Sequence, residues 1–283
     1  MSHDITIRPS GHHVDNHPGE SLLESALNAG LSVDYGCSNG NCGKCRARLV
    51  SGAIDRLHHS DFVFTPAEKN EGWFLMCCHA AATDAVIDTG LAAGSDDIER
   101  QRIDVKVRKI APLDDRHTLL HVQTPRTRRL RFLAGQSAML SSGGAILSLP
   151  IASCPCDDRN IHFHLDNESD ADALAALRVG ATLRLEGPLG DFVLDAASPR
   201  ARIMIGAGRG LAPLKSIAEH SLALAPDVAV ALLLFEPEGD PHYLRGWFRS
   251  WRDALDDFTF EAAGLGQVAR AVGGFAASPT PAD

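Results

Sequence analysis

The chain has 283 residues, of which 45% are hydrophobic and 22% charged, and its formal net charge at pH 7 is −9. This length predicts two or three domains, and the acidic charge disfavours a nucleic-acid partner. The sequence contains no uninterrupted apolar run of about 18 residues, so we expect no membrane span.

The first segment has the pattern of a small α+β domain, which we place at residues 1–94. Apolar and polar residues alternate over 4–8, which predicts a strand. An apolar stripe over 20–29 predicts a helix, and Gly30 is placed to end it. Further short strands are expected at 12–16 and 85–88, segments 47–51 and 52–57 bracket a turn, and segment 74–78 carries the last cysteine of the set described next.

Four cysteines in this segment form a recognisable ligand set. Cys37, Cys42 and Cys45 have the spacing C-x4-C-x2-C, and Cys77 follows from a distant segment. That is the ligand pattern of a plant-type [2Fe–2S] cluster. Gly36, Gly40 and Gly43 suit such a loop, because glycine adopts positive φ and lets backbone N–H groups approach the sulfurs.

Other uses of these cysteines fit less well. A zinc site favours paired C-x2-C segments, and only one is present. Disulfides suit secreted chains, and no signal peptide opens this one, so we expect a reducing, cytoplasmic location. The adjacent Cys78 is expected to be a packing neighbour of the ligand Cys77.

A charged stretch at 95–101 predicts a linker, and short strands separated by turns follow it. This pattern predicts a small antiparallel barrel over residues 101–197. Its expected strands are 104–110, 119–123, 136–140, 161–165 and 182–186, with a helix at 171–177.

From residue 198 to 283 the pattern changes to alternating strands and helices. Strands are expected at 201–205, 228–235 and 258–261, and helices at 214–224 and 244–255. This alternation predicts a parallel sheet with crossovers. With no apolar strand after Phe260, we expect the sheet to be shortened, and residues 275–283 to be a disordered tail.

The cysteine spacing, together with Leu75-Met76-Cys77, resembles the plant-type ferredoxins, whose fold is the β-grasp. The order of ferredoxin, barrel and α/β lobe resembles the ferredoxin–NADP reductase superfamily, and more narrowly the reductase components of bacterial oxygenases. This resemblance implies that NAD(P)H reduces FAD and that the cluster passes single electrons to a redox protein partner. The chain would then be an oxidoreductase.

Three segments carry the resemblance of the reductase half. They are a remnant of the flavin motif at 145–153, a Gly-Pro-x-Gly-x-Phe turn at 187–192, and a glycine-rich turn at 205–214 that precedes a helix. The resemblance implies flavin or nucleotide contacts at Ile151, Ala152, Ser153, Gly187, Pro188, Gly190, Gly206, Gly208, Gly210 and Pro213.

The flavin motif itself departs from the family pattern. Leu147 replaces the family's arginine, Leu149 replaces its aromatic residue, and Pro150 replaces its serine. The next phosphate-binding turn is replaced by an acidic stretch over 166–172, which would repel a pyrophosphate and instead favours a helix start. Arg209 stands where the family has threonine, placed to bind a phosphate or to pair with these carboxylates. The family's late Cys-Gly-Pro segment is absent.

The sequence therefore leaves two explanations open. The chain is either a divergent flavin enzyme, or a non-enzymatic [2Fe–2S] carrier whose reductase-like half has lost FAD and NAD(P)H and serves as a docking scaffold. Of the two cofactors FAD and NAD(P)H, binding of NAD(P)H is the less favoured.

Three further groups are interpreted as structural. Cys154 and Cys156 are expected to be free thiols rather than a second metal site. His162 and His164 share one face of a strand at a barrel face or interface, and Trp247 and Trp251 form a helix packing stripe.

Overall fold

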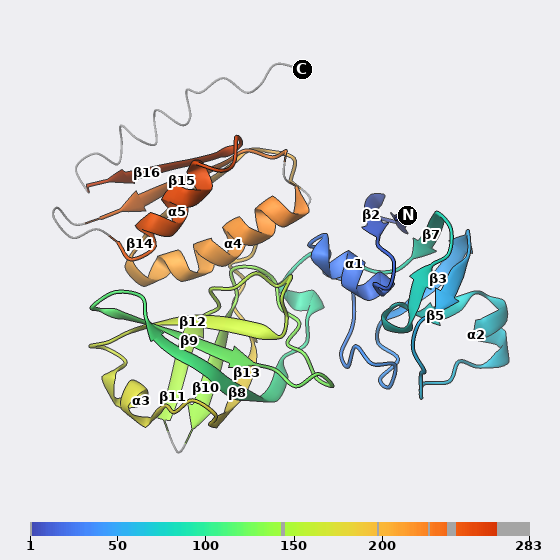
Figure 1. Cartoon of the computed structure of the whole chain (residues 1–283), viewed down its shortest axis with the longest axis horizontal. Coiled ribbons are helices and arrows are strands. Elements are labelled where there is room, and N and C mark those ends of the chain that lie inside the picture. Colours follow the sequence, from blue (N-terminus) through green and yellow to red (C-terminus); the bar gives the residue numbers. More distant parts are fainter. Residues whose placement is uncertain (1, 143–144, 197, 226, 237–241, 265–283) are drawn as a thin grey trace.

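The computed structural model describes residues 2–142, 145–196, 198–225, 227–236 and 242–264. The chain forms three bodies (Figure 1): an N-terminal domain in blue to cyan, a barrel in green to yellow, and an α/β lobe in orange to red that lies against the barrel. Each body has its own hydrophobic core. The three-part organisation agrees with the expected fold class.

The N-terminal domain is a five-stranded mixed sheet with the order β2-β1-β7-β3-β5. Helix α1 (Leu22–Asn28) begins at Ser21, whose side chain accepts the N–H of Glu24 in a capping box, and Gly30 follows its end at φ +77°. The apolar stripe of α1 is buried against the sheet. The strands are β1 (His3–Arg8), β2 (His12–Asn16), β3 (Arg46–Ser51), β5 (Trp73–Leu75) and β7 (Ala85–Asp88).

Two features of this domain were not predicted. Helix α2 (Pro66–Asn70) begins with a second capping box, between Thr65 and Glu68. A small ladder pairs β4 (Ile54–Arg56) with β6 (His79–Ala81). Strand β6 directly follows the 3-10 turn η1 (Met76–Cys78), which carries the fourth predicted cluster cysteine.

The middle domain is an antiparallel barrel with the strand order β11-β10-β13-β8-β9-β12. Alternate residues of its strands, such as Val105 and Val107, are fully buried inside. Strand β11 was not predicted, whereas helix α3 (Ala171–Ala176) lies where a helix was expected. The strands are β8 (Gln101–Pro112), β9 (His117–Gln123), β10 (Ser137–Ser142), β11 (Ala145–Pro150), β12 (Asn160–Asp166) and β13 (Thr182–Leu189).

The α/β lobe has three parallel strands within the described residues, in the order β14-β15-β16. They are β14 (Arg202–Ala207), β15 (Val230–Phe235) and β16 (Phe258–Ala263), joined through α4 (Leu211–Leu224) and α5 (Arg245–Arg252). On α5 the rings of Trp247 and Trp251 lie 3.9 Å apart, as the predicted packing stripe requires. The tail expected at 275–283 lies outside the described residues.

The N-terminal domain is fixed to the barrel through the segment that leads into the cysteine loop. The backbone N–H of Arg129 donates to the Gly36 carbonyl at 3.2 Å. Arg131 pairs with the Asp34 carboxylate at 3.0 Å and donates to the Ser32 carbonyl. Arg129 itself pairs with Asp158 at 3.1 Å, and that carboxylate is only 4% exposed.

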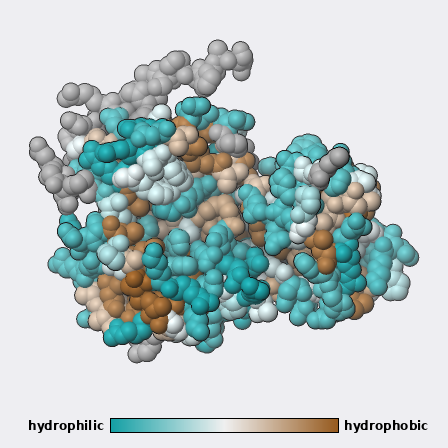
Figure 2. Space-filling model, in the orientation of Figure 1, coloured by the Kyte–Doolittle hydropathy of each residue, from teal (hydrophilic) through white to brown (hydrophobic). Residues whose placement is uncertain are grey.

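The face shown in Figure 2 is largely hydrophilic, with a hydrophobic patch on the barrel near α3 and β11. Ile146 on β11 is 69% exposed. Within the described ranges, none of the helices combines the length and the apolar character that a membrane crossing needs.

We expect Asp158→Ala to lower the free energy of unfolding by about 3 kcal/mol, because Arg129 would lose its carboxylate partner in a buried position. Urea unfolding followed by tryptophan fluorescence measures this change. The matched control is Asp34→Ala, whose carboxylate is 58% exposed and whose loss should cost less than about 1 kcal/mol. Equal effects of the two variants would contradict this account of the junction.

Candidate functional site

The first pair of predicted ligands, Cys37 and Cys42, is held by reciprocal backbone contacts. The N–H groups of Asn41 and Cys42 each donate to Cys37 Sγ at 3.3 Å. The N–H of Cys37 donates to Cys42 Sγ at 3.4 Å. These donors stabilise negative charge on sulfur, as thiolate ligands require.

Left-handed backbone in the loop aims these N–H groups at the sulfurs. Ser38 has φ 52° without being glycine, and Gly40 has φ 84°. Gly43 is required for a second reason, because a Cβ there would lie 2.2 Å from the ring of Phe62. The glycines that the sequence pointed to therefore shape the loop.

The second pair consists of Cys45, at the end of the loop, and Cys77 in η1. Both are buried, and the adjacent Cys45 thiol is the main cause that raises the pKa of Cys77. Two thiolates this close repel each other unless a cation neutralises them. For Cys37, burial raises the pKa, but the backbone N–H groups of Asn39 and Cys42 outweigh it and leave that pKa lowered.

Two close sulfur pairs, with backbone donors aimed at one of them, fit a cluster of two irons. Cys78 is fully buried, and its sulfur lies 3.6 Å from the Cys77 sulfur and 3.8 Å from the His59 carbonyl. Burial first, and the neighbouring Cys77 second, raise the pKa of Cys78 to about 12. A Cβ on Gly40 would lie 2.8 Å from this sulfur, so Cys78 packs beneath the loop.

The four predicted cluster cysteines differ in exposure. Cys42 is exposed, whereas Cys37, Cys45 and Cys77 are at most 7% exposed. The loop therefore presents one edge to a partner protein and turns the other ligands toward the protein interior.

The residues assigned to the flavin motif lie in the contact between the barrel and the lobe. Ile151 and Ala152 are fully buried. The Ala152 carbonyl accepts from Lys215 Nζ at 3.2 Å, and the Ser153 carbonyl accepts from Ser216 Oγ at 2.7 Å. The backbone carbonyls of Ala152 and Ser153 thus accept hydrogen bonds from side chains of α4.

An aromatic side chain from the lobe packs against the same part of the barrel. The hydroxyl of Tyr243 shares a hydrogen bond of 2.9 Å with Nδ1 of His164, and its ring stacks on His117 at 4.2 Å. Burial is the main reason that the pKa of His164 falls to about 3, so the imidazole is neutral. The expected histidine face is therefore part of this barrel–lobe contact. The contact of Tyr243 with the barrel was not predicted, because no sequence motif marks this residue.

The acidic stretch forms a turn that leads into α3, whose N-cap residue Asp170 makes no side-chain capping bond. Asp166 Oδ1 accepts the N–H groups of Glu168 and Ser169. Arg209, from the glycine-rich turn, pairs with Asp170 at 3.3 Å and donates to Ser169 Oγ. Arg209 thus pairs with one of these carboxylates, Asp170, which is the pairing that the sequence offered as one alternative.

The glycines of the two glycine-rich turns are not all explained in the same way. A Cβ on Gly206 would lie 2.5 Å from Leu214, and one on Gly187 would lie 3.0 Å from Ala138, so both glycines allow close packing inside the chain. The Gly190 carbonyl accepts from Gln136. A Cβ on Gly208 or Gly210 would meet open space, although His242 contacts the Gly208 carbonyl. Pro213 is buried in the first turn of α4.

These observations decide how well the cofactors fit the described residues. The cysteine loop fits a [2Fe–2S] cluster. The flavin-motif positions lack the family's side chains for FAD: Leu147, Leu149 and Pro150 stand there, and Leu149 and Ile151 are buried in the barrel core.

One interpretation is wrong: Cys154 and Cys156 are not free thiols. They are joined in a disulfide across Pro155, with a Cα–Cα distance of 5.1 Å. The turn places both side chains on the same side, facing His220 of α4. Sequence spacing could not reveal His220, because it comes from another domain.

Comparisons with known proteins agree with this architecture. Residues 5–82 match the family model of the 2Fe-2S iron-sulfur cluster binding domain. The CDP-6-deoxy-L-threo-D-glycero-4-hexulose-3-dehydrase reductase of Yersinia pestis is 28% identical over 223 residues, which cover 77% of this chain and 67% of that protein.

Two further similarities extend over most of the chain. Reductase component 1 of the terephthalate 1,2-dioxygenase of a Comamonas species is 27% identical over 267 residues, covering 93% of this chain and 79% of the relative. The crystal structure of an Amycolatopsis cytochrome P450 reductase superposes with a TM-score of 0.53 at 25% identity, covering 92% of this chain and 80% of the other. Residues 5–82 therefore match a 2Fe-2S cluster binding domain, and the chain as a whole is similar to reductases.

We expect Cys77→Ser to lose the cluster and Cys78→Ser to keep it, because only the first sulfur belongs to the two pairs. Iron per chain and visible absorbance of anaerobically purified protein measure the difference. Cys78→Ser should retain about two irons per chain and Cys77→Ser far fewer. The opposite result would exchange the roles of the two adjacent cysteines.

Proposed function

We propose that this protein transfers electrons through a [2Fe–2S] cluster held by Cys37, Cys42, Cys45 and Cys77, as the reductase component of a system that feeds an oxygenase or another redox protein. The observation that carries the proposal is the arrangement of these thiols in two close pairs, one of which receives backbone N–H donors. When bound, the cluster accepts and releases one electron at a time.

The residues of the loop would set the conditions for that transfer. Backbone N–H groups directed at Cys37 and Cys42 stabilise negative charge, which favours the reduced form. Burial of Cys45 and Cys77 excludes water from the inner side. The exposed Cys42 marks the edge at which a partner protein would dock.

The comparisons support a reductase rather than a simple carrier. The Yersinia, Comamonas and Amycolatopsis proteins are all named as reductases, and the Comamonas protein belongs to a dioxygenase. By analogy, the ferredoxin domain would occupy residues 1–94, a flavin-binding type of barrel 101–197, and a nucleotide-binding type of lobe 198–283.

In a reductase of this type, the flavin and nucleotide contacts would fall at the ten positions implied by the resemblance. The set consists of Ile151, Ala152, Ser153, Gly187, Pro188, Gly190, Gly206, Gly208, Gly210 and Pro213. Because Leu147, Leu149 and Pro150 replace the family's flavin-motif side chains, we assign no step of electron transfer to a flavin here.

A second candidate function is an electron carrier or complex subunit whose reductase-like half is a docking scaffold. The relatives do not favour it, but the replacement of the family's flavin-motif side chains by Leu147, Leu149 and Pro150 does. In this protein Tyr243 and Arg209 pair with residues of the barrel beside the expected flavin position. Donor and acceptor would then both be other proteins.

We also propose a cytoplasmic location, because the thiolate ligands of a cluster must be kept from oxidation and disulfides are rare in that compartment. Fractionation of cells that express the full chain checks this. Recovery outside the cytoplasm would contradict it.

A spectrum of the anaerobically purified protein, with iron and released flavin measured on the same sample, tests the function. We expect about two irons per chain. Near-equimolar flavin, and bleaching of the cluster by NADH, would support the reductase. Iron without flavin, even after incubation with FAD, would contradict the reductase and support the carrier. Absence of iron would overturn both functions.

A further inference from the structure

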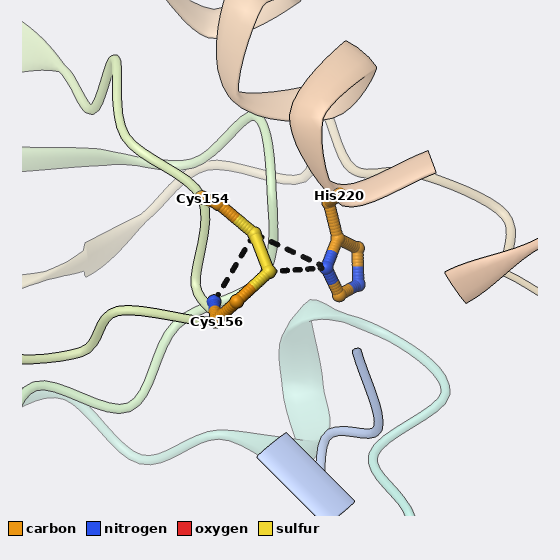
Figure 3. A group of neighbouring side chains, drawn as sticks. All are labelled: Cys154, Cys156 and His220. Atoms are coloured by element: carbon orange, nitrogen blue, oxygen red, sulfur yellow. Dashed lines mark hydrogen bonds between the residues drawn. A yellow bond between two sulfur atoms is a disulfide. The ribbon is translucent and has the colours of Figure 1, made fainter. Parts of the chain in front are cut away.

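Three metal-binding side chains from two domains converge outside the cluster loop. They are Cys154, Cys156 and His220, which we call the Cys–His cluster. Nδ1 of His220 lies 3.8 Å from each of the two sulfurs. Figure 3 shows the imidazole reaching from α4 toward both sulfurs. The three donor atoms all lie within 4.8 Å of one another.

The positions of these side chains are fixed by their surroundings. The N–H of Cys154 donates to Glu219 Oε2 at 3.0 Å, so the barrel loop is tied to the residue next to His220. One turn earlier on α4, Ser216 Oγ donates to the Ser153 carbonyl at 2.7 Å. His220 is only 5% exposed. The donors are therefore preorganised, which lowers the entropic cost of binding an ion.

The disulfide alone does not explain the imidazole. A neutral disulfide gains little from a ring nitrogen, because its sulfurs carry no proton to donate. A reduced pair differs, since two thiolates and one imidazole are the Cys2His donor set of known zinc sites. The cluster ligands on the same chain need surroundings that keep thiols reduced, and those surroundings would also reduce this pair.

The spacing matches zinc once the sulfurs separate. Zn–S bonds of about 2.3 Å and a Zn–N bond of about 2.0 Å in tetrahedral geometry place sulfur and nitrogen about 3.5 Å apart. The observed separations of 3.8 Å need only a small adjustment. The two sulfurs must move apart to about 3.7 Å, which the cleaved disulfide allows.

We propose that reduced Cys154 and Cys156 bind one Zn²⁺ together with His220, leaving the fourth position to water. Formation of the site balances as follows: a thiol or phosphine reductant gives two electrons, two protons convert the disulfide to two thiols, and Zn²⁺ then displaces both thiol protons. The oxidised pair binds no metal.

The ion would tie the barrel to the lobe next to the N-terminal domain. Cys154 and Cys156 belong to the barrel loop and His220 to the lobe. A Cβ on Gly30, at the end of α1, would lie 3.3 Å from Cε1 of His220. A small cavity bordered by Gly30, Tyr35 and Pro155 adjoins Cys156 and His220. All three domains thus meet at this point.

The test uses full-length protein that carries its iron–sulfur cluster, because empty cluster cysteines would also bind zinc. The protein is reduced with a phosphine, incubated with equimolar ZnSO₄, and passed over a desalting column with a weak chelator. Zinc and iron are then counted together. We expect about one zinc per chain beside about two irons.

Cys154→Ser/Cys156→Ser should lower the retained zinc at least tenfold with iron unchanged, and His220→Gln should weaken zinc binding at least tenfold. The control His58→Gln/His59→Gln changes an exposed pair and should retain full zinc. Zinc K-edge absorption, which the irons do not disturb, should show sulfur at about 2.3 Å and nitrogen or oxygen at about 2.0 Å.

A measurement on the unmodified chain covers the case in which the serine variant does not fold. Zinc should protect two cysteines, Cys154 and Cys156, from alkylation, as read by peptide mass spectrometry. Zinc retained by a folded double variant, no zinc on the reduced protein, or a disulfide that the phosphine does not open would each overturn the proposal.

Discussion

Four thiolates, three from one loop and Cys77 from the turn η1, would repel one another, and the N-terminal domain is organised around this repulsion. Left-handed backbone at Ser38 and Gly40 turns N–H groups toward the sulfurs. Burial of Cys45 and Cys77 makes their proximity costly without a cation. The loop is in turn fixed to the barrel by Arg129 and Arg131, so cluster geometry and domain packing depend on each other.

The reductase-like half keeps the fold of its relatives while changing the chemistry of its groove. Strand order and the glycine turns are retained, because packing requires them: Gly206 allows α4 to approach β14. The contact between the barrel and the lobe, in contrast, carries two pairs of this chain's own, Tyr243 with His164 and Arg209 with Asp170. Retention of a fold therefore does not establish retention of a cofactor site.

Features that depend on residues close together in the sequence could be predicted from the sequence. The cysteine spacing identified the cluster loop, and alternation identified most strands. Helix α2 was missed although its capping box, Thr65 with Glu68, is a local signal that could have revealed it. Tyr243 and His220 could not be found in this way, because their partners lie in another domain and only the tertiary packing brings them together. The disulfide between Cys154 and Cys156 was missed for a different reason, since its two cysteines are only two residues apart in one loop.

The exposure of a single cluster ligand has a consequence for the order of events. With Cys42 at the surface and the other three cysteines inside, an external donor and an external acceptor would have to use the same edge of the protein. They would compete for it, so no ternary complex could form and each electron would wait for one partner to leave. An excess of donor would then slow the transfer, whereas a donor held inside the chain would leave this edge to the acceptor alone.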